Sequence, residues 1–449
     1  MSAHETMRKT SDFIRNSATL KMFSIGILVL VLLIPTTMVS SVMRERENRR
    51  DDVVAEINWK WGTGQTITGP FFTIPYKSYY MDEHDKLKHT LEHLHLLPEK
   101  LDISGEIHPQ IRYRSIYEAV LYNVTATLNG HFKIPDLEHI NIEKEDILWD
   151  KAVFSVGISD MRGIRENIVI QFNDAAYQTG PGLKTGDLAE SGVMTAIPLS
   201  ARDTRYSFSF DLSLNGSDLI HITPVAETTT VSLKSNWPSP SFNGSFLPAR
   251  REITGDGFQA DWKILHLNRN YPQYWTGSTH NVGDSSFGLE LMITADIYQK
   301  STRIAKYAIM FIIFTFAAFF FAEIINRRRV HPIQYILIGL GIILFYVLLL
   351  SISEHIYFNA AYLISATAVT LLITGYSKGI LKNNYFTVTV FGILVVLYAY
   401  LFVVLQLEDY ALLMGSIGLF IVLGTVMYIT RSIDWYALNN PVDGDDGEG

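Results

Sequence analysis

Six apolar stretches interrupt the mixed pattern of polar and apolar positions along this chain. They cover residues 22–43, 304–325, 333–353, 358–376, 385–405 and 410–429. Each is close to the roughly 20 apolar residues that cross about 30 Å of hydrocarbon as a helix. Because backbone polar groups in lipid must be satisfied within the segment, helices are expected rather than strands. The pattern predicts an α+β membrane protein with six transmembrane helices, one N-terminal and five C-terminal.

The long region between the first two stretches, residues 44–303, has the pattern of short strands. Residues 207–214 alternate strictly between apolar and polar side chains, which is typical of a half-buried strand. Turn signals such as Asn129-Gly130 separate several similar runs, and this spacing favours a β-sandwich or barrel-like domain. Residues 44–61 have apolar positions at helical spacing and are predicted to continue the first membrane helix outward. Residues 298–307 are expected to lead into the second in the same way.

These segments divide the chain into five expected parts. They are a cytoplasmic N-terminus (1–21), a first transmembrane helix (22–43), a periplasmic β-rich domain (44–303), a five-helix bundle (304–429) and a cytoplasmic acidic tail (430–449). The apolar core of the first helix exceeds the about 7–15 residues of a signal peptide, which favours an uncleaved anchor. Pro35 is expected to kink this helix, whereas Pro332 suits the first turn of its own.

Charged residues beside the helices predict the orientation, because cytoplasmic loops are enriched in lysine and arginine. Loops on one side carry Arg327, Arg328, Arg329, Lys378 and Lys382. Loops on the other side carry the acids Glu354, Glu408 and Asp409. With six crossings, this asymmetry places both termini in the cytoplasm. The large domain would then lie in the periplasm of a Gram-negative cell, and the protein would be a multi-pass inner (plasma) membrane protein.

Composition excludes several classes of partner and chemistry. The formal net charge is −8, and no basic stripe with interleaved aromatic residues appears, so nucleic acid is not an expected partner. The chain has no cysteine, which excludes disulfides, thiol catalysis and cysteine-ligated metals. The lipid bilayer is the expected partner, together with a cell-wall component or an envelope protein.

Four histidines form the strongest candidate for a metal site: His84, His89, His93 and His95. A plain strand explains them more simply. Leu94 and Leu96 would then face the core while His93 and His95 face water, because alternate residues of a strand point to opposite sides. No HExxH pattern accompanies them. We therefore expect no metal and no cofactor.

No recognisable catalytic motif is present. The sequence has no GxSxG elbow, no P-loop and no dinucleotide fingerprint. Asp160 and Arg162 could be a functional pair, although a turn stabilised by the aspartate side chain explains them more simply. We expect a protein that is not an enzyme. A hydrolase in the large domain stays an alternative, because a catalytic triad is recognised by geometry and not by sequence order.

Transport would require polar groups within the bilayer, where ionisable residues are costly and usually functional. Glu323 lies in the last turn of its helix, near Arg327 and Arg328, with which it can pair, and Glu354 and His355 lie at the outer end of the third stretch. These three residues are the candidates for a transporter or flippase. The middles of the helices carry only small or weakly polar residues, which more often mediate helix packing.

Several segments resemble one known family. They read VGISDMRGI at 156–164, SNWPSPSF at 235–242, FLPARR at 246–251, GFQADW at 257–262, HPIQY at 331–335 and TRSIDWY at 430–436. With them, the chain closely resembles the inner membrane protein CreD family, also called the Cet family. The likeness runs from the first helix to residue 436.

The resemblance implies an inner-membrane protein linked to envelope integrity, stress, the β-lactam response and colicin tolerance. It supplies no catalytic residues. The leading hypothesis is a non-enzymatic envelope protein whose large domain binds an envelope component or a partner, and the alternative is a transporter or flippase.

The segment at 235–262 is the candidate recognition surface within that large domain. Its members are Trp237, Phe242, Arg250, Arg251 and Trp262. Loops on a rigid β scaffold often carry binding function, whereas aromatic residues also bury large areas in a core. Both readings are therefore open from the sequence.

Overall fold

The computed structural model describes residues 18–135, 142–200, 205–292, 297–326, 330–407 and 410–431. The chain divides into two compact units, of which one comprises Met1–Arg49 with Asp296–Gly449 and the other Arg50–Ala295. Three groups of charges from the sequence analysis lie outside the described residues: the arginines at 327–329, the acids at 408–409 and the C-terminal acidic tail.

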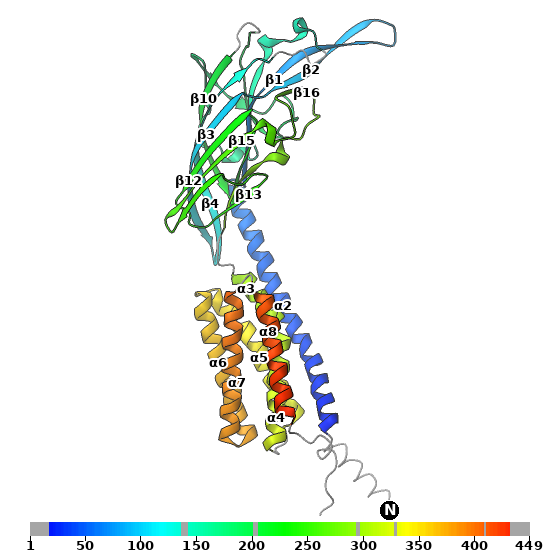
Figure 1. Ribbon diagram of the computed structural model, residues 1–449, viewed down its shortest axis with the longest axis vertical. Coiled ribbons are helices and arrows are strands. Elements are labelled where there is room, and N and C mark those ends of the chain that lie inside the picture. Colours follow the sequence, from blue (N-terminus) through cyan, green and yellow to red (C-terminus); the bar gives the residue numbers. More distant parts are fainter. Residues whose placement is uncertain are drawn as a thin grey trace, which may run out of the picture. The chain divides into compact units, whose positions relative to one another are not determined.

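The unit that contains both ends of the chain is helical (Figure 1). Its helices are α2 (Ala18–Trp61), α3 (Ile297–Lys306), α4 (Ala308–Asn326), α5 (Pro332–Ser353), α6 (Phe358–Leu381), α7 (Asn384–Gln406) and α8 (Ala411–Thr430). The last turns of α2, from Arg50 onward, belong to the other unit.

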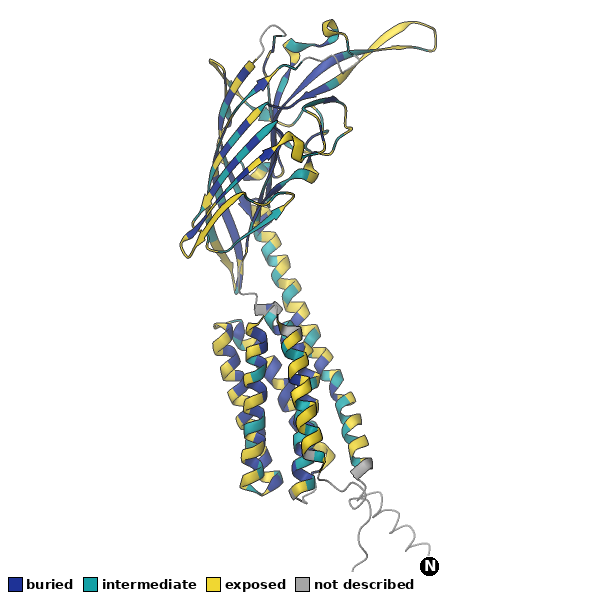
Figure 2. Ribbon diagram, viewed as in Figure 1, coloured by how far each residue is buried: buried dark blue, intermediate teal, exposed yellow. Residues whose placement is uncertain are grey.

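Five helices in the described part of the chain are long and apolar enough to cross a membrane, namely α2, α4, α5, α6 and α7. The apolar segment found within α8, Leu413–Tyr428, is shorter. The sixth crossing therefore stays a prediction. The outer faces of the helices expose large apolar side chains, as in Leu363 (68%) and Phe420 (77%), and Figure 2 shows these faces as exposed. Such faces suit a lipid environment.

The helix ends follow local sequence signals. Pro332 occupies the first turn of α5 as predicted, and the His331 side chain accepts a hydrogen bond from the Ile333 amide at 3.3 Å. The helix α2 passes through Pro35 without a break in helical structure. Residues 298–307 are helical as expected, but they form the separate helix α3, which ends before Tyr307.

The second unit consists mainly of two β-sheets, with the C-terminal turns of α2 beside them (Figure 1). The nine-stranded sheet has β13-β17-β11-β1-β5-β9-β8 in order, with β2 pairing to β1 and β16. Its strands are β1 (Gln65–Met81), β2 (Leu87–Leu96), β5 (Val153–Ile158), β8 (Gly180–Pro181), β9 (Gly192–Ala196), β11 (Leu219–Thr223), β13 (Pro240–Gly244), β16 (Tyr274–Thr276) and β17 (Phe287–Leu291).

The eight-stranded sheet has the order β14-β15-β12-β3-β4-β10-β6-β7. Its strands are β3 (Lys100–Arg114), β4 (Tyr117–Lys133), β6 (Val169–Phe172), β7 (Ala175–Gln178), β10 (Arg205–Ser217), β12 (Thr228–Ser235), β14 (Arg250–Thr254) and β15 (Gly257–Leu265). Burial along β10 alternates residue by residue, which confirms the half-buried strand predicted at 207–214.

The two sheets enclose one hydrophobic core. Phe132 of the eight-stranded sheet packs edge-on against Phe72 and Phe154 of the other, with ring centroids 4.7 and 5.9 Å away. Edge-to-face pairs of this kind add to the stabilisation from buried area. Facing sheets joined by side chains from both inner faces make the β-sandwich that the strand spacing favoured.

The prediction that residues 44–61 continue the first helix is confirmed. The last turns of α2 are fixed to the sandwich by polar contacts. The Trp61 Nε1–H donates to the Tyr122 carbonyl at 3.3 Å, and the Asn58 amide donates to Asp218 at 2.6 Å. Arg114 also forms an ion pair with Glu56. These contacts make the end of α2 an integral part of the second unit.

Candidate functional sites

The aromatic residues of the segment at 235–262 pack together beneath strands β13 and β15. Trp262 is 2% exposed, and its ring lies edge-on to Phe242 at 5.7 Å. Its Nε1–H donates to the Phe246 carbonyl at 3.2 Å. Trp237 is half-buried against the core and donates to the Met292 carbonyl at 3.2 Å. Each indole N–H thus has a partner within the fold.

Arg250 and Arg251 lie side by side on β14, where both side chains are exposed. Among the strands of the described residues, β14 pairs only with β15, so it is an edge strand of the eight-stranded sheet. Within the described residues, neither guanidinium forms an ion pair. Charged side chains on an edge strand discourage pairing with other chains, and the same charges are available to a ligand. These two residues are the accessible members of the candidate recognition surface.

A polar groove on the eight-stranded sheet was missed by the sequence analysis. It has a volume of about 540 Å³, and it lies over β4, β10 and β6. Its polar lining residues are Thr125, Thr127, Glu166, Asn167, Gln171, Ser209, Asp211 and Ser213. Thr127 donates to Asp211 at 2.7 Å, which orients that carboxylate. Two smaller hollows of about 270 and 370 Å³ continue across β3 and β12.

Glu323 is a nearly buried carboxylate at the end of α4, only 7% exposed. It forms an ion pair with Lys21 of α2 and accepts a hydrogen bond from the Tyr335 hydroxyl of α5 at 3.2 Å. Lys21 also donates to the Val330 carbonyl at 3.2 Å. A buried charge is tolerated only when it is paired and hydrogen-bonded, and Glu323 meets both conditions through three helices. The arginines proposed as its partners lie outside the described residues.

Glu354 follows the last turn of α5 and has similar partners. Arg46 of α2 lies 3.8 Å from its carboxylate, and the Tyr298 hydroxyl of α3 donates to it at 3.4 Å. The neighbouring His355 is exposed. The structure therefore brings Glu323 and Glu354 into separate clusters rather than one, and His355 belongs to neither.

The expectation that His95 faces water was wrong, because its side chain is fully buried. Its Nε2 lies 2.9 Å from Asp187 and its Nδ1 lies 3.3 Å from Thr73. The loop that carries Asp187 and, separately, the Trp275 indole cover the face of β2 that the alternating pattern predicted to be exposed to solvent. Burial lowers the pKa of His95 below its ordinary value. In the described part of the chain, no three His, Asp or Glu residues are grouped as a metal site would need.

Asp160 and Arg162 form the aspartate-stabilised turn that the sequence allowed. The Asp160 carboxylate accepts from the Arg162 amide at 3.1 Å and from its guanidinium at 2.9 and 2.8 Å. It also accepts from the amide and hydroxyl of Thr63, both at 2.9 Å. The Arg162 guanidinium holds the pKa of this carboxyl well below its usual range. Arg162 in turn stacks on the Trp59 ring, with 4.7 Å to its centroid.

The apolar helices and the β-sandwich define an integral membrane protein with a large extramembrane domain. A family model described as "Inner membrane protein CreD" matches residues 17–436. The Escherichia coli K12 protein described as "Inner membrane protein CreD" is 33% identical over 429 residues, which cover 94% of each chain. This chain belongs to the CreD family of multi-pass inner membrane proteins.

Among solved structures, yeast LTA4 hydrolase in complex with Bestatin matches 50% of this chain and 35% of its own. The sequences are 11% identical and the TM-score is 0.19, which is too low to indicate a shared fold.

Proposed function

We propose that this protein is a non-enzymatic inner-membrane protein that contributes to envelope integrity and to tolerance of stress, β-lactams and colicins. Its β-sandwich would lie in the periplasm and bind a cell-wall component. Membership of the CreD family supports the location in the inner membrane. The charge asymmetry of the loops supports six crossings with both termini in the cytoplasm.

The polar groove over β4, β10 and β6 carries the binding part of the proposal. Short hydroxyl and amide side chains line it together with the carboxylates Glu166 and Asp211, and none of its lining residues is basic. Such a surface matches a ligand rich in O–H and N–H donors and disfavours a phosphate-rich polymer. Peptidoglycan has this chemistry in its sugar hydroxyls, peptide amides and free amines. We therefore assign peptidoglycan to the groove.

Binding of purified sacculi to the full-length protein in nanodiscs tests this assignment. Ser209→Trp places an indole in the groove, and Ser207→Trp makes the same change two residues away on β10, outside the lining. We expect co-sedimentation of the wild type and of Ser207→Trp, and about a tenfold loss for Ser209→Trp. Equal binding by all three proteins, or none by the wild type, would contradict the assignment.

A transporter or flippase is the second candidate, and the burial of Glu323 and the partial burial of Glu354 beside membrane helices favour it. Complementation of a deletion strain under envelope stress separates the two candidates. One variant carries Glu323→Gln, Glu354→Gln and His355→Ala, and another carries Ser209→Trp in the polar groove, all matched for membrane abundance. Rescue by the first variant alone supports recognition by the β domain. Rescue by the second alone puts transport first.

A further inference from the structure

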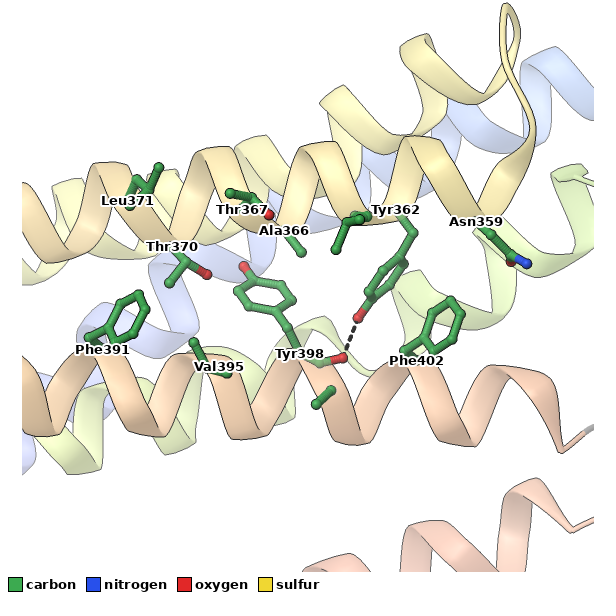
Figure 3. Close-up of a pocket in the computed structure, with 12 residues that line it drawn as sticks. Asn359, Tyr362, Ala366, Thr367, Thr370, Leu371, Phe391, Val395, Tyr398 and Phe402 are labelled. Carbon is green, nitrogen blue, oxygen red and sulfur yellow. Dashed lines mark hydrogen bonds between the residues drawn. The ribbon is translucent and has the colours of Figure 1, made fainter.

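An apolar groove runs between α6 and α7 on the surface of the helical unit. Its volume is about 630 Å³. Figure 3 shows side chains from the two helices converging on it, with Phe391, Tyr398 and Phe402 from α7 opposite Tyr362 and Thr370 from α6. The lining extends along α6 from Asn359 to Leu371, a distance of about 18 Å at 1.5 Å per residue.

Three hydroxyl groups that line this groove have no protein partner. Tyr398 is 4% exposed, and within the described residues its hydroxyl makes no hydrogen bond. The hydroxyls of Thr367 and Thr370 likewise lack a partner in the described part of the chain.

Two contacts fix the position of Tyr398 on α7, one to its backbone and one to its ring. The Tyr362 hydroxyl donates to the Tyr398 carbonyl at 2.7 Å, as the dashed line in Figure 3 marks. The Phe345 ring packs behind it with a centroid distance of 4.8 Å. In Figure 3 the ring projects from α7 toward Thr367 and Thr370 of α6. A hydroxyl fixed in hydrocarbon without an acceptor is unfavourable, so a ligand that supplies one would be stabilised there.

We propose that this groove binds an isoprenoid quinone. Carbonyl oxygens on its ring would accept hydrogen bonds from Tyr398 and Thr370, beside the Phe391 ring. The prenyl chain would occupy the apolar remainder of the groove, whose open side exposes Leu363 and Leu371.

The depth of the hydroxyls favours a quinone over a phospholipid. Thr367 and Thr370 are 8 and 11 residues beyond Asn359, about 12–17 Å along α6 from the end of the groove. The ester carbonyls of a phospholipid lie at the boundary of the hydrocarbon, whereas a quinone ring travels within it. This inference concerns the helical unit and is independent of peptidoglycan binding.

Quinone retention by the full-length protein tests the proposal. The protein is purified in a mild detergent, reconstituted into nanodiscs that contain ubiquinone, washed, and extracted for chromatographic measurement of quinone per protein. The double variant Tyr398→Phe, Thr370→Val removes two hydroxyls and preserves the shape of the groove. Tyr385→Phe makes the same tyrosine change at an exposed position of α7.

We expect near-stoichiometric quinone in the wild type and in Tyr385→Phe, and a loss of roughly 5- to 30-fold in the double variant, the effect of two lost hydrogen bonds. Quantification of phospholipid in the same extracts shows whether a phospholipid occupies the groove instead of the quinone. Retention of phospholipid without quinone would overturn the proposal, as would equal quinone retention by all three proteins.

Discussion

Lys21 and Arg46 lie about seven turns apart on α2, so their side chains leave the same side of that helix. Each pairs with a carboxylate of the bundle, Lys21 with Glu323 and Arg46 with Glu354. Their separation of 25 residues corresponds to about 37 Å, more than the roughly 30 Å of a hydrocarbon core. The two ion pairs therefore fix α2 to the bundle near both surfaces of the membrane. Leu32, on the same side and 1% exposed, supplies the packing between them.

Replacing one member of the Lys21–Glu323 pair should destabilise the protein more than replacing both members. Glu323→Gln removes the buried negative charge that pairs with Lys21 and should lower the stability of the helical unit by about 3 kcal/mol. Replacing both residues, with Lys21→Met and Glu323→Leu, should restore most of the loss, because neither charge is then buried. Unfolding in mixed micelles of increasing SDS content, followed by circular dichroism, measures both effects. A double variant as unstable as Glu323→Gln would refute this account of the pair.

Contact between α2 and α5 depends on Gly339. A Cβ at this position would collide with the Leu32 side chain and crowd the Phe316 ring. Gly339→Ala should therefore destabilise the same unit by about 1–3 kcal/mol through overpacking. Leu32→Ala in the same chain should relieve the collision and recover part of the loss. Gly392→Ala on α7, where a Cβ meets no neighbour, is the matched control in the same SDS titration.

Acid should weaken the β-sandwich partly through Asp160. Because the pKa of this carboxyl is lowered in the folded protein, its stabilisation is present at neutral pH and is lost as pH falls below about 4. Asp160→Asn should cost about 2 kcal/mol at pH 7 and progressively less in acid. Tryptophan fluorescence during denaturation reports on this unit, since six of the seven tryptophans lie within Arg50–Ala295. Asp150→Asn, the same change at an exposed position of this unit, is the matched control.

Asp218 should have the opposite pH dependence. Burial and the nearby charge of Glu290 raise the pKa of Asp218, so its ionisation opposes folding as pH rises through the folded-state pKa. Asp218→Asn should stabilise the sandwich by about 1 kcal/mol at pH 7 and have little effect below pH 4. The backbone φ of 60° at this position suits asparagine. Destabilisation at pH 7 would show that the carboxylate is needed for its bond from Asn58.

Local patterns predicted the helices and the sandwich because each depends on neighbours along the chain. Apolar length located α4 to α7, and alternation located β10. The sites depend instead on sheet order and helix contacts. The polar groove joins Thr127 to Asp211 across strands 84 residues apart. The partner of Glu323, Lys21, is 302 residues away, whereas the nearby arginines were the only partners that sequence proximity could suggest.

The prediction that His95 faces water was wrong for the same reason. Its alternation correctly placed Leu94 and Leu96 in the core, but a strand covered on both faces carries no signal of the second cover. That cover comes from Asp187 and Trp275, which are distant in sequence. The sequence offered no usable hint, because a histidine between two buried leucines is compatible with a buried or an exposed side chain.

The parallel pairing of β1 with β11 has a consequence for how the chain is made. Gln65 lies opposite Ile220, so although the C-terminal half of β1 pairs with β2 as soon as that strand is made, its N-terminal end must wait for a partner synthesised 155 residues later. At a translation rate of about 5–20 residues per second, that delay is roughly 8–30 seconds. Throughout it, the sheet around β1 lacks β11 and β17, so the core side chains Phe72 and Ile74 are incompletely covered. Biogenesis of this protein should therefore depend on holding chaperones at the membrane more than that of a protein built from successive hairpins.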